Sequence, residues 1–197
     1  MTTLFLLRHG PTAAGAAGAP LGRLDWPVLA QGQERWPAIK DQLLGLDLAL
    51  VLTSPLVRAR EHAQDLGLPC RILPDLAEQD FGAWDGLPWE QIQGAEAFFR
   101  DPVGTAPPGG ESFGQCARRA VAAAFGSLPA QGAVLVLAHA GTLRAILGRA
   151  LGLPPERCLD LAWNPFGLSR LELLADERGL LRYHNLPLPW PGASGIL

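Results

Sequence analysis

The chain has 197 residues, of which 48 % are hydrophobic and 18 % are charged, and its formal net charge is −3. This composition is typical of an ordered globular protein with a sizeable core and argues against a disordered chain. The small negative charge argues against nucleic acid or an anionic membrane as a partner.

The cysteines and the N-terminus indicate where the protein resides. Cys70, Cys116 and Cys158 are scattered and form no CxxC pair, which argues against disulfides or a zinc site and indicates a reducing compartment. The first apolar run is too short to span a membrane and has no basic leader. We therefore expect a soluble, cytoplasmic protein that needs no metal and no cofactor.

The first half of the chain predicts two strands and two helices. Apolar runs at 3–7 and 48–53 are short and rich in Leu and Val, as are strands buried on both faces. A helix is expected over 30–45, kinked or shortened by Pro37. Ser54 is expected to be the N-cap of the second helix, since Pro55 follows it. The Ala/Gly-rich stretch 13–22 is typical of a loop.

The second half repeats this alternation. A Pro/Gly-rich loop at 102–110 precedes a helix that begins at Ser112, where Gln115 has capping-box spacing. A third buried strand is expected at 133–138, followed by a helix that ends near Gly152. Alternating runs at 168–174 and 180–185 predict an antiparallel pair. The Pro-rich tail 187–197 is expected to be poorly ordered.

Strands that alternate with helices predict an α/β fold whose mostly parallel sheet is covered by helices. In such sheets, ligands bind beyond the carboxyl ends of the strands. Three polar clusters follow predicted strands: Arg8-His9, the segment from Ser54 to Arg58, and His139. A fourth cluster, around Glu78, lies in a loop-like segment. Together these clusters indicate an anion site at one edge of the sheet.

Each cluster taken alone has an ordinary structural interpretation. An Arg-His pair can be a solvated strand end, and neighbouring strand residues point to opposite faces unless Gly10 turns the chain. Arg58 alone would be a surface arginine, and a histidine such as His139 is often only structural. Glu78 has nearby competitors in Glu61, Asp80 and Asp85.

The combination is more specific than its parts. LLRHGPT, SPLVRA, AEQDFGAWDG and LAHAGTLRAIL, in this order, resemble the histidine phosphatase superfamily, whose fold is phosphoglycerate-mutase-like. The resemblance spans residues 3–174. It implies a three-layer α/β/α sandwich and a phosphomonoesterase that acts on a small phosphorylated metabolite.

The resemblance also implies catalytic roles. His9 becomes the nucleophile that forms phosphohistidine, and Glu78 becomes the proton donor to the leaving oxygen. Arg8, Arg58 and a protonated His139 bind phosphate and balance its charge. Many members have an acid or glutamine at the position of Pro11 and, at that of Gly15, an asparagine that helps to hold phosphate, so this sequence departs from the family pattern at both positions.

Further motifs resemble the α-ribazole phosphatase branch, which implies α-ribazole 5′-phosphate as a candidate substrate. These are GRLDWP at 22–27, FGAWDG at 81–86 and PPGGES at 107–112. We expect one domain over 1–197, with loops 13–27 and 84–112 shaping the substrate pocket. The candidate substrate-binding residues are Gly10, Thr12, Gly22, Arg23, Trp84 and Ala140. Trp89 is a further candidate for packing a ring, and Glu111 is interpreted as part of a helix cap.

Three alternatives remain open. A phosphoglycerate mutase would use the same groups, but mutases generally carry a longer insertion, and Glu78 and His139 are only 61 positions apart here. A broad-specificity sugar or nucleotide phosphatase is the second alternative. The third is a non-catalytic phosphate-binding protein, against which the intact set of catalytic groups argues. A homodimer is compatible with the sequence.

Overall fold

The computed structural model describes residues 1–190, and β1 (Thr2–Arg8) lies near the centre of its sheet. The six strands have the order β3-β2-β4-β1-β5-β6. The other five are β2 (Leu48–Thr53), β3 (Cys70–Ile72), β4 (Gly132–Ala138), β5 (Gly167–Leu173) and β6 (Gly179–Pro187). Strands β3, β2, β4 and β1 pair in parallel, whereas β5 and β6 are antiparallel. The mostly parallel sheet and its antiparallel pair are as the sequence predicts.

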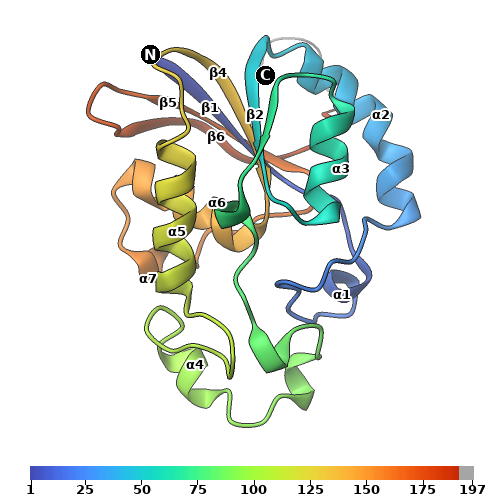
Figure 1. Cartoon of the computed structure of the whole chain (residues 1–197), viewed down its shortest axis with the longest axis vertical. Coiled ribbons are helices and arrows are strands. Elements are labelled where there is room, and N and C mark those ends of the chain that lie inside the picture. Colours follow the sequence, from blue (N-terminus) through green and yellow to red (C-terminus); the bar gives the residue numbers. More distant parts are fainter. Residues whose placement is uncertain (191–197) are drawn as a thin grey trace.

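Helices cover both faces of the sheet (Figure 1). The helices α2 (Ala30–Leu44) and α3 (Val57–Asp65) pack on one face, and α5 (Phe113–Phe125) and α6 (Ala140–Leu151) pack on the other. Strand β1 contributes to both cores, because Phe5 and Leu7 face α2 and α3 while Leu4 and Leu6 face α5 and α6. This arrangement confirms the expected three-layer α/β/α sandwich.

Several short helices complete the fold; in Figure 1, α1 and α4 lie below the sheet, and α7 lies at the left beside α5. They are α1 (Ala13–Ala16), α4 (Glu96–Arg100), α7 (Pro155–Cys158), and the 3-10 turns η1 (Pro74–Leu76), η2 (Gly82–Trp84) and η3 (Trp89–Gln91). Helix α1 corrects the expectation of a loop over 13–22 for its first four residues, whereas 17–22 form a loop as predicted. It forms because the Thr12 hydroxyl accepts a hydrogen bond from the Gly15 N–H and caps its first turn.

One helix boundary differs from the prediction, whereas the helix expected over 30–45 is found close to its predicted bounds. Ser54 is not the N-cap of α3, because the helix begins only at Val57 and Leu56 occupies the N-cap position. The Ser54 hydroxyl instead accepts a hydrogen bond from the Leu56 N–H at 3.1 Å. Pro37 lies inside α2 and does not mark its start.

Other local signals are confirmed. Ser112 and Gln115 form the expected capping box at the start of α5. Gly152 ends α6 with a φ of 67°, in the left-handed region that favours glycine. Strand β3 and helix α7 are too short to have been recognised from periodicity, with three and four residues.

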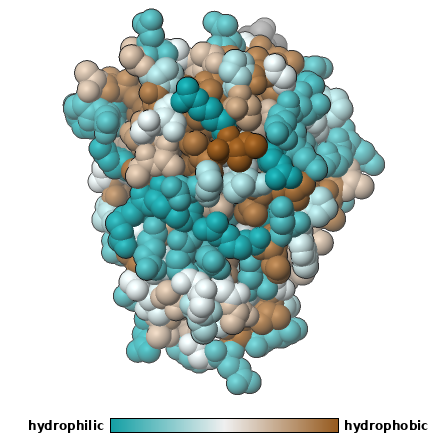
Figure 2. All heavy atoms as spheres, viewed as in Figure 1, coloured by the Kyte–Doolittle hydropathy of each residue, from teal (hydrophilic) through white to brown (hydrophobic). Residues whose placement is uncertain are grey.

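The first part of the Pro-rich tail is packed against the sheet, contrary to expectation. Leu188 is fully buried, and Gln42 exchanges side-chain hydrogen bonds with the backbone of Trp190. Residues 191–197 lie outside the described part of the chain. On the face seen in Figure 2, hydrophobic patches are interrupted by hydrophilic side chains. Within residues 1–190, no helix has the length and apolar character required to cross a membrane.

Candidate active site

The sheet register brings three of the four polar clusters together. Arg8 pairs with Ala138 at the end of β4, and Thr53 pairs with Leu137. Arg8-His9, Ser54 and His139 therefore follow neighbouring strands at the same edge of the sheet. The ring centroids of His9 and His139 are 5.1 Å apart.

The ring of His9 is oriented by its own backbone neighbour. Its Nδ1 lies 2.6 Å from the carbonyl oxygen of Gly10, which can only accept, so Nδ1 carries the proton and Nε2 has a free lone pair. Burial, then the charges of Arg58 and Arg8, hold the pKa of His9 well below its ordinary value. The neutral ring is therefore the stable form in this arrangement.

Gly10 is required for packing at this turn. A Cβ at this position would overlap the Phe166 ring and the Val28 side chain. The backbone at Gly10 is not in the left-handed region, so conformational freedom is not the reason for the glycine.

His139 is held in the opposite tautomer. Arg58 Nε donates to His139 Nδ1 at 3.2 Å, so Nε2 carries the proton and donates to Ser54 Oγ at 2.7 Å. Burial and the Arg58 charge hold the pKa of His139 well below its ordinary value. The expected imidazolium is therefore not the form that this arrangement favours, and the positive charge of the site belongs to its arginines.

Arg58 is fully buried and also fastens the segment that follows α1. Its Nη1 donates to the Leu24 carbonyl, and its Nη2 donates to the carbonyls of Leu21 and Gly22. The Asp85 carboxylate accepts hydrogen bonds from the N–H groups of the same segment, at Gly22, Arg23 and Leu24, with distances of 2.7 to 2.8 Å. Arg58 therefore binds the carbonyl groups of this loop, and Asp85 binds its N–H groups.

Glu78 lies at the N-terminus of α6. Its Oε2 accepts from the Gly141 N–H at 3.0 Å, and its Oε1 accepts from the Gln79 N–H at 2.9 Å. A carboxylate is stabilised there by the free N–H groups and the helix dipole. Of its competitors, Asp80 accepts from the Gly82 N–H, and Asp85 holds the loop described above.

Glu111 and Arg119 support the Glu78 segment and were missed as functional residues. Arg119 Nη2 donates to the Glu78 carbonyl at 2.9 Å, and Arg119 pairs with the Glu111 carboxylate. Glu111 Oε1 accepts from the Asp80 N–H. Burial acts to raise the pKa of Glu111, but the bonds from Arg119 and Asp80 outweigh it and lower that pKa. Arg119 lies within α5 but Glu111 precedes its N-cap, so helical periodicity gives no signal for the pair.

Among the described residues, the Arg8 guanidinium makes one hydrogen bond and has one buried nitrogen without a partner. Its Nη1 donates to the Trp163 carbonyl, while its Nε is buried without a hydrogen-bond partner within residues 1–190. Burial lowers the pKa of Arg8, and the nearby Glu78 charge acts in the opposite direction. An unpaired buried N–H of this kind is expected where an anion binds.

The candidate substrate-binding residues occupy different environments. Thr12 caps α1, and Trp84 packs in a small apolar cluster with Phe98. A Cβ at Gly22 would overlap the Gln79 carbonyl, so this glycine permits a close approach of two loops. Arg23 is 40 % exposed in its side chain and lies 3.6 Å from Glu111. Gly10 and Ala140 lie directly after His9 and His139.

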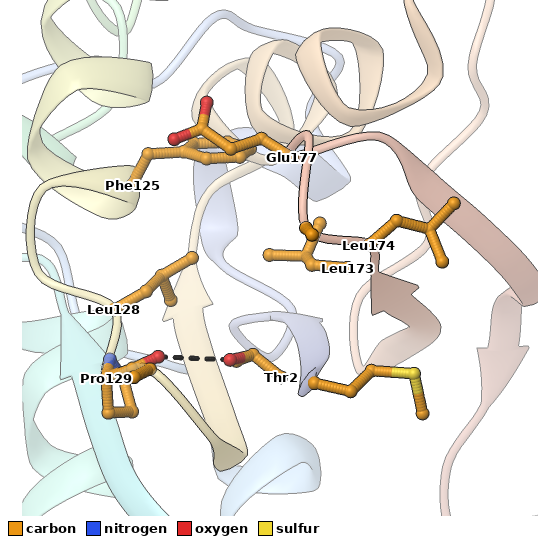
Figure 3. A pocket seen from close by; sticks show the side chains of 10 residues that line it. Thr2, Phe125, Leu128, Pro129, Leu173, Leu174 and Glu177 are labelled. Carbon is orange, nitrogen blue, oxygen red and sulfur yellow. Dashed lines mark hydrogen bonds between the residues drawn. The ribbon is translucent and has the colours of Figure 1, made fainter.

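Two cavities lie at opposite ends of the sheet. One of about 270 Å³ is bounded by Glu78, Ala140 and several aromatic residues. A larger one of about 480 Å³ lies where β1 begins, lined by residues such as Thr2, Leu128 and Leu173 (Figure 3). Thr2 donates to the Pro129 carbonyl there, and none of the catalytic candidates lines it. Residues 1–190 contain no cluster of three or more potential metal ligands.

This fold and this pair of histidines flanked by arginines define a phosphatase of the histidine type, and the chain belongs to the histidine phosphatase superfamily (branch 1), whose family model matches residues 4–186. The adenosylcobalamin/alpha-ribazole phosphatase of Escherichia coli (strain K12) is 32 % identical over 164 residues, which cover 78 % of this chain and 81 % of that protein.

Two further comparisons bear on substrate. The glucosyl-3-phosphoglycerate phosphatase of Mycolicibacterium vanbaalenii is 30 % identical over 78 % of this chain and 76 % of that protein. The crystal structure of the alpha-ribazole phosphatase from Shigella flexneri superposes with a TM-score of 0.83 at 28 % identity, covering 93 % of this chain and 96 % of that one. The family implies phosphorylated small-molecule substrates.

Proposed function

We propose that the protein hydrolyses phosphomonoesters through a phosphohistidine formed on His9. The observation that carries this proposal is the free Nε2 of His9, fixed by the Nδ1 contact to the Gly10 carbonyl and lying beside His139, Arg58 and Arg8. A neutral, oriented imidazole among buried cations suits attack on a phosphoryl group.

The reaction has two steps. His9 Nε2 attacks phosphorus, the bond to the ester oxygen breaks, and Glu78 donates a proton to the leaving alcohol. Arg8 and Arg58 stabilise the charge on the phosphoryl oxygens, and His139 donates its Nε2 proton to one of them in place of Ser54. Water then attacks phosphohistidine, Glu78 takes up the proton of that water, and His9 is regenerated with release of inorganic phosphate.

Trapping the phosphoenzyme tests the nucleophile. Wild type mixed with a labelled phosphomonoester and quenched in alkali is expected to carry an acid-labile phosphoryl group. His9→Ala is expected to carry none and to lose turnover of p-nitrophenyl phosphate. His184→Ala is a matched control, because His184 is bonded to Ser169 and Ala162. Labelling of His9→Ala, or a fully active His9→Ala protein, contradicts the proposal.

The substrate favoured by sequence similarity is α-ribazole 5′-phosphate. The similarity to α-ribazole phosphatases and an aromatic cavity beside Glu78 support this choice. A panel that includes α-ribazole 5′-phosphate, glucosyl-3-phosphoglycerate and sugar and nucleotide phosphates tests it by kcat/KM. Release of free phosphate without isomerised phosphoglycerate separates the phosphatase from the mutase alternative.

A further inference from the structure

The cavity beside Glu78 has walls of unusual composition. It is bounded by Glu78, Arg144 and five aromatic residues, Phe81, Trp89, Phe98, Phe99 and Phe113. Glu78 is the proposed proton donor to the leaving oxygen, so the group attached to that oxygen must lie on this side of the site. The cavity is therefore the place where the leaving alcohol is recognised.

The aromatic residues form a continuous wall. Trp89 stacks on Phe98 with an interplanar angle of 21°, and the ring of Phe81 meets Trp89 edge-on. Phe99 contacts Trp89 at a centroid distance of 5.1 Å and yet is 58 % exposed. An exposed phenylalanine at the mouth of an aromatic cavity offers a face to a planar ligand.

Arg144 supplies the only positive charge among the residues that line this cavity. It lies one helical turn after Ala140, so it faces the same way as the N-terminus of α6. Its Nε donates to the Leu161 carbonyl at 2.7 Å, which fixes the guanidinium. Within residues 1–190, its Nη1 and Nη2 have no acceptor and it forms no ion pair.

Glu78 does not neutralise Arg144. The Glu78 carboxylate is bonded to the backbone at Gly141 and Gln79 and forms no ion pair with Arg144. Burial lowers the pKa of Arg144, with the Glu78 charge acting in the opposite direction. Arg144 is half-buried, and its two Nη nitrogens are available to donate to an anionic group of a ligand in this cavity.

We propose that this cavity selects leaving alcohols that carry both a planar apolar ring and an anionic group, with the ring against the aromatic wall and the anion at Arg144. The proposal rests on the phosphatase function above and specifies its substrate class. α-Ribazole 5′-phosphate has the ring but no second anion, so it would use the aromatic wall alone, and the cavity proposal differs here from the substrate that sequence similarity favours: an ester with both a ring and an anion is expected to be the better substrate.

A pair of esters that differ only in charge tests the anion contact. Wild type is expected to hydrolyse para-carboxyphenyl phosphate with a kcat/KM about 10-fold above that for para-carbamoylphenyl phosphate, and Arg144→Gln is expected to lose this preference. The two esters also differ in the acidity of their leaving groups. This difference affects wild type and Arg144→Gln alike, so it cancels when the carboxylate-to-carboxamide ratio of kcat/KM for wild type is divided by that for the variant. Arg149→Gln is the matched control, because Arg149 lies on the same helix, is exposed and pairs with Glu177.

Phe99→Ala tests the aromatic wall. Its kcat/KM for para-carboxyphenyl phosphate is expected to fall about 10-fold relative to that for ethyl phosphate, which has no ring. An unchanged ratio contradicts the ring contact.

Calorimetry with the His9→Ala protein separates this proposal from the function itself. Tighter binding of the carboxylate ester than of the carboxamide, abolished by adding Arg144→Gln, supports the cavity even if wild type shows no turnover. In that case the phosphatase function fails and the binding site stands. Turnover with a carboxylate preference that Arg144→Gln leaves unchanged overturns the cavity proposal and leaves the phosphatase function intact.

Discussion

At the scale of single residues, the two histidines of the site differ in what holds them. His9 is oriented by one contact to the adjacent Gly10 carbonyl, whereas His139 lies between Arg58 and Ser54. The motif could indicate that both rings belong to the site. It could not indicate their opposite tautomers, because these depend on partners more than 80 positions away from His139.

Arg58→Ala is expected to be nearly inactive. Loss of a transition-state arginine in phosphoryl transfer costs about 10³–10⁵ in rate. The variant is also expected to unfold at a lower temperature, because the carbonyls of Leu21, Gly22 and Leu24 lose their donor. Turnover of p-nitrophenyl phosphate and thermal unfolding measure the two effects. Near-wild-type turnover by a folded variant would contradict the proposed phosphate pocket.

Glu111→Gln is expected to reduce kcat while leaving KM nearly unchanged. The Glu111 side chain does not line the cavity beside Glu78. It pairs with Arg119, which donates a hydrogen bond to the Glu78 carbonyl. The substitution should therefore displace the proton donor and leave phosphate binding unchanged. A displacement of about 1 Å can cost about 10²-fold in rate. Steady-state kinetics measure the split, and Glu111→Asp should restore part of kcat. A rise in KM alone would indicate direct substrate contact.

At the scale of elements, α6 joins a catalytic end to a structural end. Its N-terminal N–H at Gly141 binds Glu78, and its C-terminus is closed by Gly152 in the left-handed conformation. Both ends could be located from the sequence, since His139-Ala-Gly and Gly-Leu-Pro flank the apolar run. The carboxylate that binds the N-terminus of α6 could not be located in this way, because Glu78 lies 63 positions upstream of Gly141.

The two glycines of α6 are expected to separate activity from stability. A Cβ at Gly141 would overlap the Glu78 carboxylate, whose flexible side chain can move away, so Gly141→Ala should fold normally. Its kcat should fall about 10²–10⁴-fold, the usual contribution of general acid-base catalysis. Gly152→Ala should keep its activity and lose about 1 kcal/mol of stability. Kinetics and urea unfolding of both variants check this contrast.

The boundaries of other elements were predictable where a signal is local. β2 begins and ends as the apolar run predicts, and the Ser112 capping box depends on residues three positions apart. The start of α3 was predicted wrongly, because Ser54 is an accepted N-cap type but is bonded to His139 across the sheet. A side chain recruited by a distant partner is no longer a local signal.

At the scale of the whole molecule, the three layers enclose the histidines. All four histidines have pKa values below the ordinary value because of burial, and that of His62, which stacks on Trp36, is about 4. They are neutral in the folded protein at pH values where the unfolded chain binds protons. The fold class follows from the alternation of strands and helices, but this property follows only from how the layers close.

Stability is therefore expected to fall as the pH drops below about 6.5. Unfolding takes up protons there, and each group contributes up to about 1.4 kcal/mol per pH unit between its unfolded and its folded pKa. Urea unfolding at pH 7.5, 6.5 and 5.5 measures the slope. The unfolding free energy of His62→Gln should fall less steeply with decreasing pH than that of wild type, by the contribution of one histidine. A flat profile across this range would contradict burial of neutral histidines.

The double role of Arg58 has an evolutionary consequence. Its guanidinium donates to the loop carbonyls at Leu21, Gly22 and Leu24, so the same side chain serves both the proposed catalysis and folding. An inactive descendant that keeps this fold should therefore retain Arg58 and lose His9, whose ring holds only the adjacent carbonyl. In families of decayed copies, the arginine is expected to outlast the nucleophile.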